Sequence, residues 1–347
     1  MPKKIAIITH PLQYNYGGVL QAFALSSILS KYGEVCVIRN VKSIKDVVKY
    51  LLDWLVPFHR FKHRHIKEKF VSFNNLEDKL NCLDIDVVVI GSDQVWRASY
   101  VIENMTFGQF LSNDSSILLI AYAASFGTNQ WEFNDSQTEL LQNEIRKFSC
   151  ISVREQSGVD LCSRYLNVKA QWVLDPTLLL DKKYYMKYVK NEKVHNKCFC
   201  YLLDYENSFN RSMMNQMAKE LECEVDKVHL VKSKLLKRIL PTLNIPGWLS
   251  KIYNARMVLT DSFHGCVFCI IFNKPFFVLE NEKGGNDRIY SLLKMFRLEN
   301  RIITGTVREN FFKEATDIDW QSVSRILTLE REKSMLFIDK ALKDNRL

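Results

Sequence analysis

The sequence has no stretch that approaches the roughly twenty apolar residues of a membrane-spanning helix. Its first ten residues, MPKKIAIITH, lack the long apolar region and small-residue cleavage site of a secretory signal peptide. The nine cysteines are odd in number and scattered, unlike a disulfide framework. These absences predict reduced thiols and a cytoplasmic protein.

Glycine and proline number only 12 and 7 in 347 residues, and no repeat period or low-complexity tract stands out. Collagenous, disordered and repeat architectures are therefore excluded. The composition is 47% hydrophobic and 25% charged, which is typical of a folded globular protein. A chain of this length is sufficient for two domains, each with its own core.

The formal net charge of +9 favours an acidic partner, such as nucleic acid, anionic lipid or a phosphorylated substrate. No signature of a nucleic-acid-binding module is present, and the basic clusters lack regular aromatic interleaving. We therefore expect no nucleic-acid partner.

The first half of the chain alternates short apolar runs with helical periodicity. Residues 4–9 (KIAIIT) are continuously apolar and β-branched, as in a strand buried on both faces of a parallel sheet. Residues 19–33 have helical spacing, and 34–40 are the next strand. Such units place ligands at the carboxyl ends of their strands. Further strands are expected at 84–91, 117–125 and 149–155, and the segment 171–180 carries another strand into Pro176, which gives a Rossmann-like domain at 1–180.

A second alternation of the same kind begins at 198. Strands are expected at 198–205, near 228–231, at 256–262 and at 275–280, with helices at 211–221, 247–255, 263–272 and 288–296. This predicts a second Rossmann-like domain at 195–320. The remaining segment, 320–347, is expected to be a helix, and one arrangement open to it is packing against the first domain. The predicted fold class is α/β, with two Rossmann-like domains facing a cleft.

An insertion at 45–72 interrupts the first domain. Its first half is apolar with aromatic residues. Its second half contains Glu68 as its only acid and a basic cluster of His59, Arg60, Lys62, His63, Arg64, His65, Lys67 and Lys69. One interpretation is an interfacial helix that brings 47–70 into peripheral contact with anionic lipid at the inner face of a membrane. The other is a helix pair that packs on the domain and has a solvated basic face. The sequence leaves both open.

The sharpest polar cluster is TDSFHG (260–265), where an expected strand passes into a helix. Polar residues such as Ser262 can cap the helix, whose free N–H groups form an anion site. His264 would stand beside the bound anion and can exchange a proton near neutral pH. A structural histidine that closes the turn is the alternative.

Several motifs occur together with this cluster: YNYGGVLQAFAL (14–25), GSDQVW (91–96), YAASFG (122–127), SVREQSG (152–158), VLDPTLLL (173–180) and IFNKPFFVLEN (271–281). In this order, and over about 5–293, they resemble the polysaccharide pyruvyl transferase family. The resemblance implies a GT-B-like fold of two Rossmann domains. It also implies transfer of a pyruvyl group from phosphoenolpyruvate, the donor substrate, to a sugar hydroxyl of a surface, capsular or exopolysaccharide precursor. No metal or further cofactor is expected.

A doubly anionic donor requires cationic groups, preferably guanidinium. Arg154, Arg288 and Lys283 are the candidates. The chain departs from the family pattern at Glu282-Lys283-Gly284-Gly285, where an arginine–glycine pair would be expected. Lysine keeps the charge but loses the bidentate fork, so the grip of this loop on the donor is in doubt.

Ketal formation requires protonation of the enol carbon and removal of the acceptor's protons, so acids and bases are needed. His264 is the candidate general acid or phosphate stabiliser, and Asp93 and Glu155 are candidate bases, with capping or ion pairing as their alternative. Trp96 could stack on a sugar ring or be buried. Gly17 and Gly18 permit close approach to a ligand, beside Asn15 and His10.

Two other functions stay open on the sequence. A nucleotide-sugar-dependent GT-B glycosyltransferase would use the same fold, although no acidic residue is clearly placed to bind a ribose. A non-catalytic sugar- or phosphate-binding protein is the third possibility. The acceptor sugar, its linkage, a ketal or enolpyruvyl product, attachment to lipid and the oligomeric state are not determined by the sequence.

Overall fold

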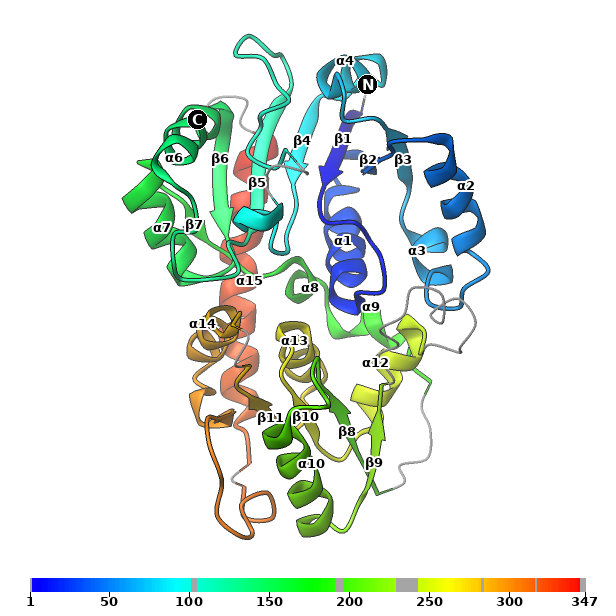
Figure 1. Ribbon diagram of the computed structural model, residues 1–347, viewed down its shortest axis with the longest axis vertical. Coiled ribbons are helices and arrows are strands. Elements are labelled where there is room, and N and C mark those ends of the chain that lie inside the picture. Colours follow the sequence, from blue (N-terminus) through cyan, green and yellow to red (C-terminus); the bar gives the residue numbers. More distant parts are fainter. Residues whose placement is uncertain are drawn as a thin grey trace. The chain divides into compact units, whose positions relative to one another are not determined.

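The computed structural model describes residues 2–100, 105–190, 196–228, 243–281, 284–315 and 317–343, without the side chains of 49 and 51. The chain forms two compact units (Figure 1). Unit 1 comprises 1–55, 62–180 and 328–347, and unit 2 comprises 56–61 and 181–327. Each unit contains its own parallel sheet, as the alternation predicted.

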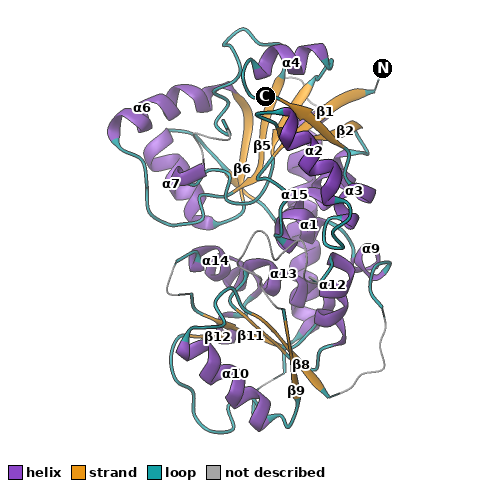
Figure 2. Cartoon of the chain, turned by 45° about the vertical axis from the view of Figure 1, so that its right-hand side comes forward, coloured by secondary structure: helices purple, strands orange, loops and turns teal. Residues whose placement is uncertain are grey.

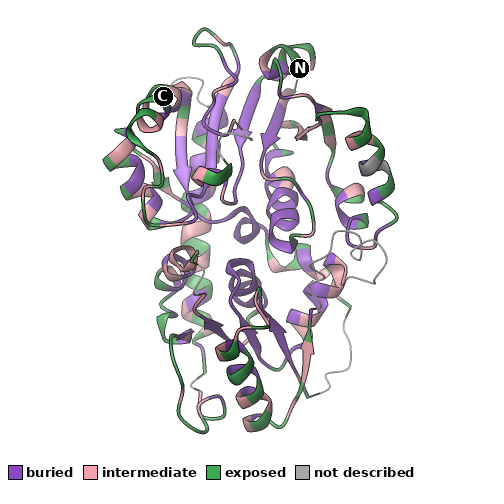
Figure 3. Cartoon of the chain, in the orientation of Figure 1, coloured by how far each residue is buried: buried purple, intermediate pink, exposed green. Residues whose placement is uncertain are grey.

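Unit 1 is built on a seven-stranded sheet in the order β3-β2-β1-β4-β5-β6-β7, in which every pairing is parallel. The strands are β1 (Lys3–Ile8), β2 (Gly33–Asn40), β3 (Glu68–Val71), β4 (Val87–Ile90), β5 (Leu118–Ala124), β6 (Phe148–Val153) and β7 (Gln171–Trp172). All four residues of β4 are buried, because helices cover both faces of such a sheet (Figure 3).

The helices of unit 1 connect these strands (Figure 2). They are α1 (Tyr16–Leu29), α2 (Ile44–Asp53), α3 (Arg60–His65), α4 (Leu76–Cys82), α6 (Asp135–Glu144) with η1 (Ile145–Lys147), α7 (Gln156–Leu166) and α8 (Pro176–Leu179). The last helix, α15 (Trp320–Lys343), contributes its C-terminal part to unit 1. There Ser334 Oγ accepts a hydrogen bond from the backbone N–H of Leu174 at 2.9 Å, and Arg331 Nε donates to the carbonyl of Leu178 at 2.9 Å.

Unit 2 has a five-stranded parallel sheet in the order β12-β11-β10-β8-β9. The strands are β8 (Lys197–Tyr201), β9 (Glu224–Lys227), β10 (Val258–Thr260), β11 (Phe276–Leu279) and β12 (Ile302–Ile303). The helices are α9 (Lys182–Met186), α10 (Ser208–Glu220), α12 (Ile245–Asn254), α13 (Phe263–Phe272) and α14 (Asn286–Phe296), with η2 (Glu299–Arg301). Among the described helices of the whole chain, none is long and apolar enough to cross a bilayer.

Two strand predictions are corrected, and the insertion contains a strand of the sheet. Helix α3 leads into β3, which pairs with β2, and Lys62 is fully buried, whereas Arg60, Arg64 and His65 of α3 are exposed. The strand expected near 228–231 lies earlier, at β9, and 229–231 fall outside the described residues. The strand expected to run into Pro176 is β7, which is only two residues long, because Asp175 caps α8, which begins at Pro176.

Candidate functional site

In each sheet the strand order reverses at one point, between β1 and β4 in unit 1 and between β8 and β10 in unit 2. Connections leave such a point in opposite directions, which opens a crevice at the carboxyl ends of the two strands. The side chains at these two edges are therefore the candidates for ligand contact, and each edge is described within its own unit.

The unit 1 edge begins with the turn after β1 and the start of α1. Thr9 Oγ1 donates to the carbonyl of Ser92 at 2.9 Å, which ties the end of β1 to the loop after β4. Asn15 caps α1 by accepting a hydrogen bond from the N–H of Gly18 at 2.9 Å. A Cβ on Gly18 would lie 3.0 Å from the Asn15 amide nitrogen, so the missing side chain makes room for the cap.

The glycine pair has a different role from the predicted one. Gly17 and Gly18 lie in the first turn of α1, and neither has a positive φ. Both are buried. The absence of a side chain on Gly18 leaves room for the side chain of Asn15, which caps the N-terminus of α1.

Asp93 follows β4 and lies at the centre of the unit 1 edge. Its backbone has φ +81°, a conformation that side-chain-bearing residues seldom adopt and that recurs at functional sites. Its carboxylate accepts from Asn15 Nδ2 at 3.4 Å and forms an ion pair with Arg154 Nη2 at 3.2 Å. The candidate base is thus held by a helix cap and a guanidinium.

Arg154 forms the core of a buried cluster of carboxylates. Its Nη1 lies 2.9 Å from Asp175 Oδ2, and its Nε lies 3.9 Å from Glu155 Oε2, in addition to the Asp93 contact. Burial by itself lowers the pKa of Arg154, but the carboxylates of Asp93, Asp175 and Glu155 outweigh it, and the net shift is upward. The guanidinium therefore stays charged.

This geometry corrects the donor-binding role predicted for Arg154. Its side chain has no exposed surface, and three carboxylates surround it, so a phosphate would meet negative charge rather than an open cation. Arg154 instead positions Asp93 and Asp175. Ser92 Oγ completes the arrangement by donating to Asp175 Oδ2 at 2.9 Å.

Two further sequence candidates in unit 1 are buried. Glu155 has no exposed side-chain surface, and its Oε1 accepts from the N–H of Phe126 at 2.8 Å, so it anchors the loop after β5 instead of meeting a sugar hydroxyl. Trp96 has no exposed surface, stacks on Phe107 at 4.8 Å and donates its Nε1–H to the carbonyl of Thr106. The predicted sugar stacking by Trp96 is wrong, because no ring face is accessible.

A cavity of about 120 Å³ opens at the carboxyl ends of β1 and β2 in unit 1. Its polar lining comes from Thr9, His10, Gln13, Arg39, Asn40, Asp46 and Glu68. His10 Nε2 is buried and has no hydrogen-bond partner among the described residues. Mixed hydroxyl, amide, imidazole and charged groups of this kind suit the hydroxyls of a sugar.

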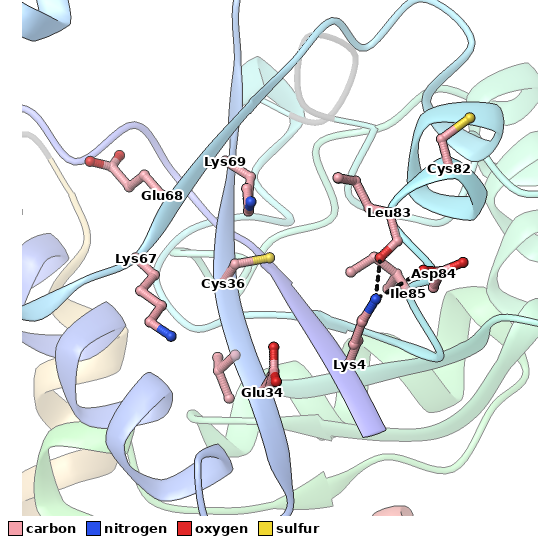
Figure 4. Close-up of a pocket in the computed structure, with 11 residues that line it drawn as sticks. Lys4, Glu34, Cys36, Lys67, Glu68, Lys69, Cys82, Leu83, Asp84 and Ile85 are labelled. Atoms are coloured by element: carbon pink, nitrogen blue, oxygen red, sulfur yellow. Dashed lines mark hydrogen bonds and ion pairs between the residues drawn. The ribbon is translucent and has the colours of Figure 1, made fainter. Parts of the chain in front are cut away.

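A larger cavity, of about 630 Å³, lies at the amino ends of β1, β2 and β3 (Figure 4). Lysines and carboxylates share its lining, and Lys4 is paired with Asp84 at 2.9 Å. This cavity is at the end of the sheet opposite to the switch point, so we do not assign it to the candidate site.

The unit 2 edge contains the TDSFHG cluster. Thr260 Oγ1 donates to the carbonyl of Tyr201 at 2.7 Å and joins the ends of β10 and β8. Ser262 caps α13 by accepting from the N–H of Gly265 at 3.5 Å. A Cβ on Gly265 would lie 2.3 Å from Thr260 Oγ1, so only glycine allows α13 to start this close to β10.

Asp261, between these residues, was not among the sequence candidates. Its Oδ1 accepts from the N–H of Leu203 at 2.7 Å, whereas its buried Oδ2 has no hydrogen-bond partner among the described residues. Burial raises the pKa of this carboxyl to about 6, although the backbone N–H bonds oppose the shift. A group that titrates there can donate or accept a proton near neutral pH.

His264 and Arg288 approach the same edge. His264 lies in the first turn of α13 and is only 6% exposed, and its ring meets Phe263 edge-on at 5.1 Å. The Arg288 guanidinium, from the first turn of α14, lies 5.8 Å from the centre of the Phe263 ring. Unit 2 thus brings an imidazole, a guanidinium and a helix N-terminus together, a combination that suits a phosphate or carboxylate. Lys283 lies outside the described residues.

The sequence profile of the family described as polysaccharide pyruvyl transferase matches residues 15–283, which is most of the chain. The chain belongs to this family. The resemblance noted from the motifs is confirmed, and the family is one of transferases in polysaccharide biosynthesis. No curated protein sequence gives a significant match.

Solved structures share the fold. A putative UDP-N-acetylglucosamine 2-epimerase from Listeria monocytogenes has 11% identity and a TM-score of 0.57 over 99% of this chain and 98% of that one. The UDP-GlcNAc 2-epimerase of Methanocaldococcus jannaschii has 13% identity and a TM-score of 0.52, with 94% and 99% covered. The spinosyn forosaminyltransferase SpnP has 9% identity and a TM-score of 0.50, with 99% covered on each side. At such identities the likeness establishes the GT-B-type fold of two parallel-sheet α/β domains and nothing more.

Proposed function

We propose that this family member transfers the pyruvyl group of phosphoenolpyruvate to hydroxyls of a sugar in a surface or exopolysaccharide precursor, with a ketal as product. The observation that carries the proposal is that His264 and Arg288 both contact Phe263 at the carboxyl edge of the unit 2 sheet, in a chain that belongs to the pyruvyl transferase family. Phosphoenolpyruvate has two anionic groups on a small frame, and this edge supplies a guanidinium, an imidazole and backbone N–H groups.

The two edges suit different substrates. The unit 2 edge has cationic groups and suits the anionic donor. The unit 1 edge has Asp93, Glu155 and Asp175 around a single guanidinium, an excess of negative charge that disfavours a second anion. Among these carboxylates Asp93 alone has exposed side-chain surface, 8%, so we assign it to the acceptor hydroxyl as base.

The reaction then balances as follows. A proton passes to the methylene carbon of phosphoenolpyruvate, and the adjacent carbon becomes electrophilic. A sugar hydroxyl attacks that carbon and loses its proton to a base. A second hydroxyl attacks the same carbon, its proton is released, and the carbon–oxygen bond to phosphate breaks with the electron pair leaving on phosphate. His264 and Asp261 are the two proton donors at the unit 2 edge, and Arg288 stabilises the departing phosphate.

The test is phosphate release from phosphoenolpyruvate in the presence of a panel of sugar acceptors, with NMR of the product. A ketal shows a methyl signal and an enolpyruvyl ether shows a vinylic methylene, although both add the same mass. His264→Ala should lower kcat about a hundredfold or more, because a positioned acid is worth about 10²–10⁴ in rate. The matched control is His65→Ala, an exposed histidine on α3. Nucleotide release from a nucleotide sugar, with phosphoenolpyruvate inert, would establish the glycosyltransferase alternative instead.

A further inference from the structure

Helix α2 of unit 1 has an exposed apolar stripe. Ile44, Val48 and Leu52 recur every four residues and are 76%, 50% and 53% exposed, and Trp54 and Leu55 at the helix end are each 56% exposed. Residues four apart lie on one face of a helix. Five of the eleven exposed large apolar side chains among the described residues fall within these twelve positions. We call these five residues the α2 stripe.

The opposite face of α2 is fixed to unit 1. Tyr50 is buried, and its ring lies 4.5 Å from that of Phe70 and 4.4 Å from that of His63. The Arg39 guanidinium lies 4.6 Å from the same ring. The stripe is therefore the outer face of an anchored helix, and an apolar patch of this kind marks an interaction surface.

The charges of this segment favour an anionic partner. Among the described side chains of 41–69, every acid is at least half-buried: Asp46 accepts hydrogen bonds from the N–H groups of Lys42 and Ser43, Asp53 is buried, and Glu68 pairs with Arg39 and Lys62. The exposed charged side chains there are all basic: Lys42, Lys45, Arg60, Arg64, Lys67 and Lys69. An apolar stripe on a helix within a basic segment is the pattern of an interfacial helix on anionic lipid.

The same helix contributes one residue to the lining of the smaller cavity in unit 1. Asp46, in the first turn of α2, lines the cavity of about 120 Å³ together with Arg39, Asn40 and His10. Asp46 lies four positions before Tyr50, on the anchored face, so the cavity lies across α2 from the stripe, about one helix diameter, or roughly 10 Å, away.

We propose that the α2 stripe binds an anionic membrane surface and presents the unit 1 cavity to an acceptor sugar attached to a membrane lipid. This deepens the proposed function, because it identifies the acceptor as lipid-linked, and that part rests on the pyruvyl transfer proposed above. Attachment of the stripe to the membrane stands on the exposed residues alone. It adds apolar burial to the attraction between basic side chains and anionic headgroups.

The first experiment is co-sedimentation with phosphatidylcholine vesicles, with and without phosphatidylglycerol. The wild-type chain should bind the anionic vesicles and lose binding as salt is added. The variant V48E/L52E/W54E should bind at least about tenfold more weakly, since it replaces three apolar side chains that would enter the bilayer with carboxylates that anionic headgroups repel. The matched control is L140E/L329E/L336E, which adds the same charge at side chains that are 52%, 57% and 53% exposed. This control should bind as the wild type does.

Three results would overturn the proposal: no binding of the wild type to anionic vesicles, equal weakening by both triple variants, or a wild-type dimer that the stripe variant converts to a monomer. The dimer would assign the stripe to a second copy of the chain. Thermal unfolding is the control for folding: both triple variants should unfold at the wild-type temperature.

Activity separates this proposal from the proposed function. With a water-soluble acceptor the stripe variant should keep wild-type phosphate release. With a lipid-linked acceptor embedded in vesicles, its rate should fall at least about tenfold. If phosphoenolpyruvate is inert with every acceptor, pyruvyl transfer fails while vesicle binding still decides the role of the stripe. If the stripe variant matches the wild-type rate with both acceptors, the inference of a lipid-linked acceptor is wrong, whereas pyruvyl transfer stands.

Discussion

Replacing Arg154 by methionine tests the role that the structure gives to this residue. Methionine replaces the apolar part of the arginine side chain but not its charge. The buried carboxylates of Asp93, Asp175 and Glu155 then lack the guanidinium that compensates their negative charge. Removing one partner of a buried ion pair costs about 3–5 kcal/mol. For a domain of this size, each kcal/mol lowers Tm by about 2–4 °C, so the expected decrease is roughly 6–20 °C.

The matched control is Arg211→Met. Arg211 is 58% exposed and pairs with Glu206 at 3.4 Å, and a surface pair of this kind is worth about 0–1 kcal/mol. The assay is thermal unfolding followed by circular dichroism, for both variants and the wild type. The Arg154 variant should lose stability and the control should not.

The pH dependence gives a second readout. Without the guanidinium, the pKa values of the three carboxyls rise in the folded state, so that state binds protons more readily than the unfolded chain. The deficit of the variant should therefore shrink as the pH is lowered from 7 towards about 5. A constant deficit would contradict the electrostatic origin.

The refuting result combines stability with donor binding. If Arg154→Met unfolds at the wild-type temperature and yet loses affinity for phosphoenolpyruvate, Arg154 is a donor ligand, as the sequence suggested, and the positioning role is wrong. A destabilised variant that still binds phosphoenolpyruvate under folding conditions supports the structural assignment.

Two further predictions concern the unit 2 edge. Gly265→Ala should destabilise the protein by about 1–3 kcal/mol, because its Cβ would lie 2.3 Å from Thr260 Oγ1, whereas Gly305→Ala, with nothing within 4 Å of its Cβ, should not; urea unfolding measures both. Asp261→Asn should remove a pH-dependent component of stability. Burial raises the pKa of Asp261 in the folded state to about 6 from 3.8, so the wild type loses stability as the pH rises from about 4 to 6. The asparagine amide still accepts the hydrogen bond from Leu203 but does not titrate. The variant should therefore show no such slope in pH-dependent unfolding. An unchanged slope would exclude Asp261 as its source.

The sequence was most informative where the signal is local. The β1–α1–β2 unit was predicted to within a few residues, because apolar periodicity reports secondary structure directly. The TDSFHG motif was located at the end of β10 and the start of α13, where Ser262 provides the cap. Short elements were harder: β3 (Glu68–Val71) was missed because it has only four residues, two of them charged, and pairing with β2 stabilises it.

Side-chain burial could not be predicted at the site. Trp96 and Glu155 have residue types that suit sugar chemistry, yet both are fully buried. Asp261 was overlooked as a candidate in its own right, although its position directly after a buried strand at the carboxyl edge was a signal that could have singled it out.

The sequence by itself therefore determined the two successive α/β alternations, the family, and the cluster around His264, because periodicity and motifs are carried by neighbouring residues. The tertiary structure alone decided which groups share an environment. Arg154 forms ion pairs with Asp175 and Asp93, which are 21 and 61 positions away in the chain, and only the assembly of the parallel sheet brings these residues together. The exposure of the α2 stripe likewise depends on which face of the helix Tyr50 anchors, since an amphipathic pattern does not state whether its apolar face is covered.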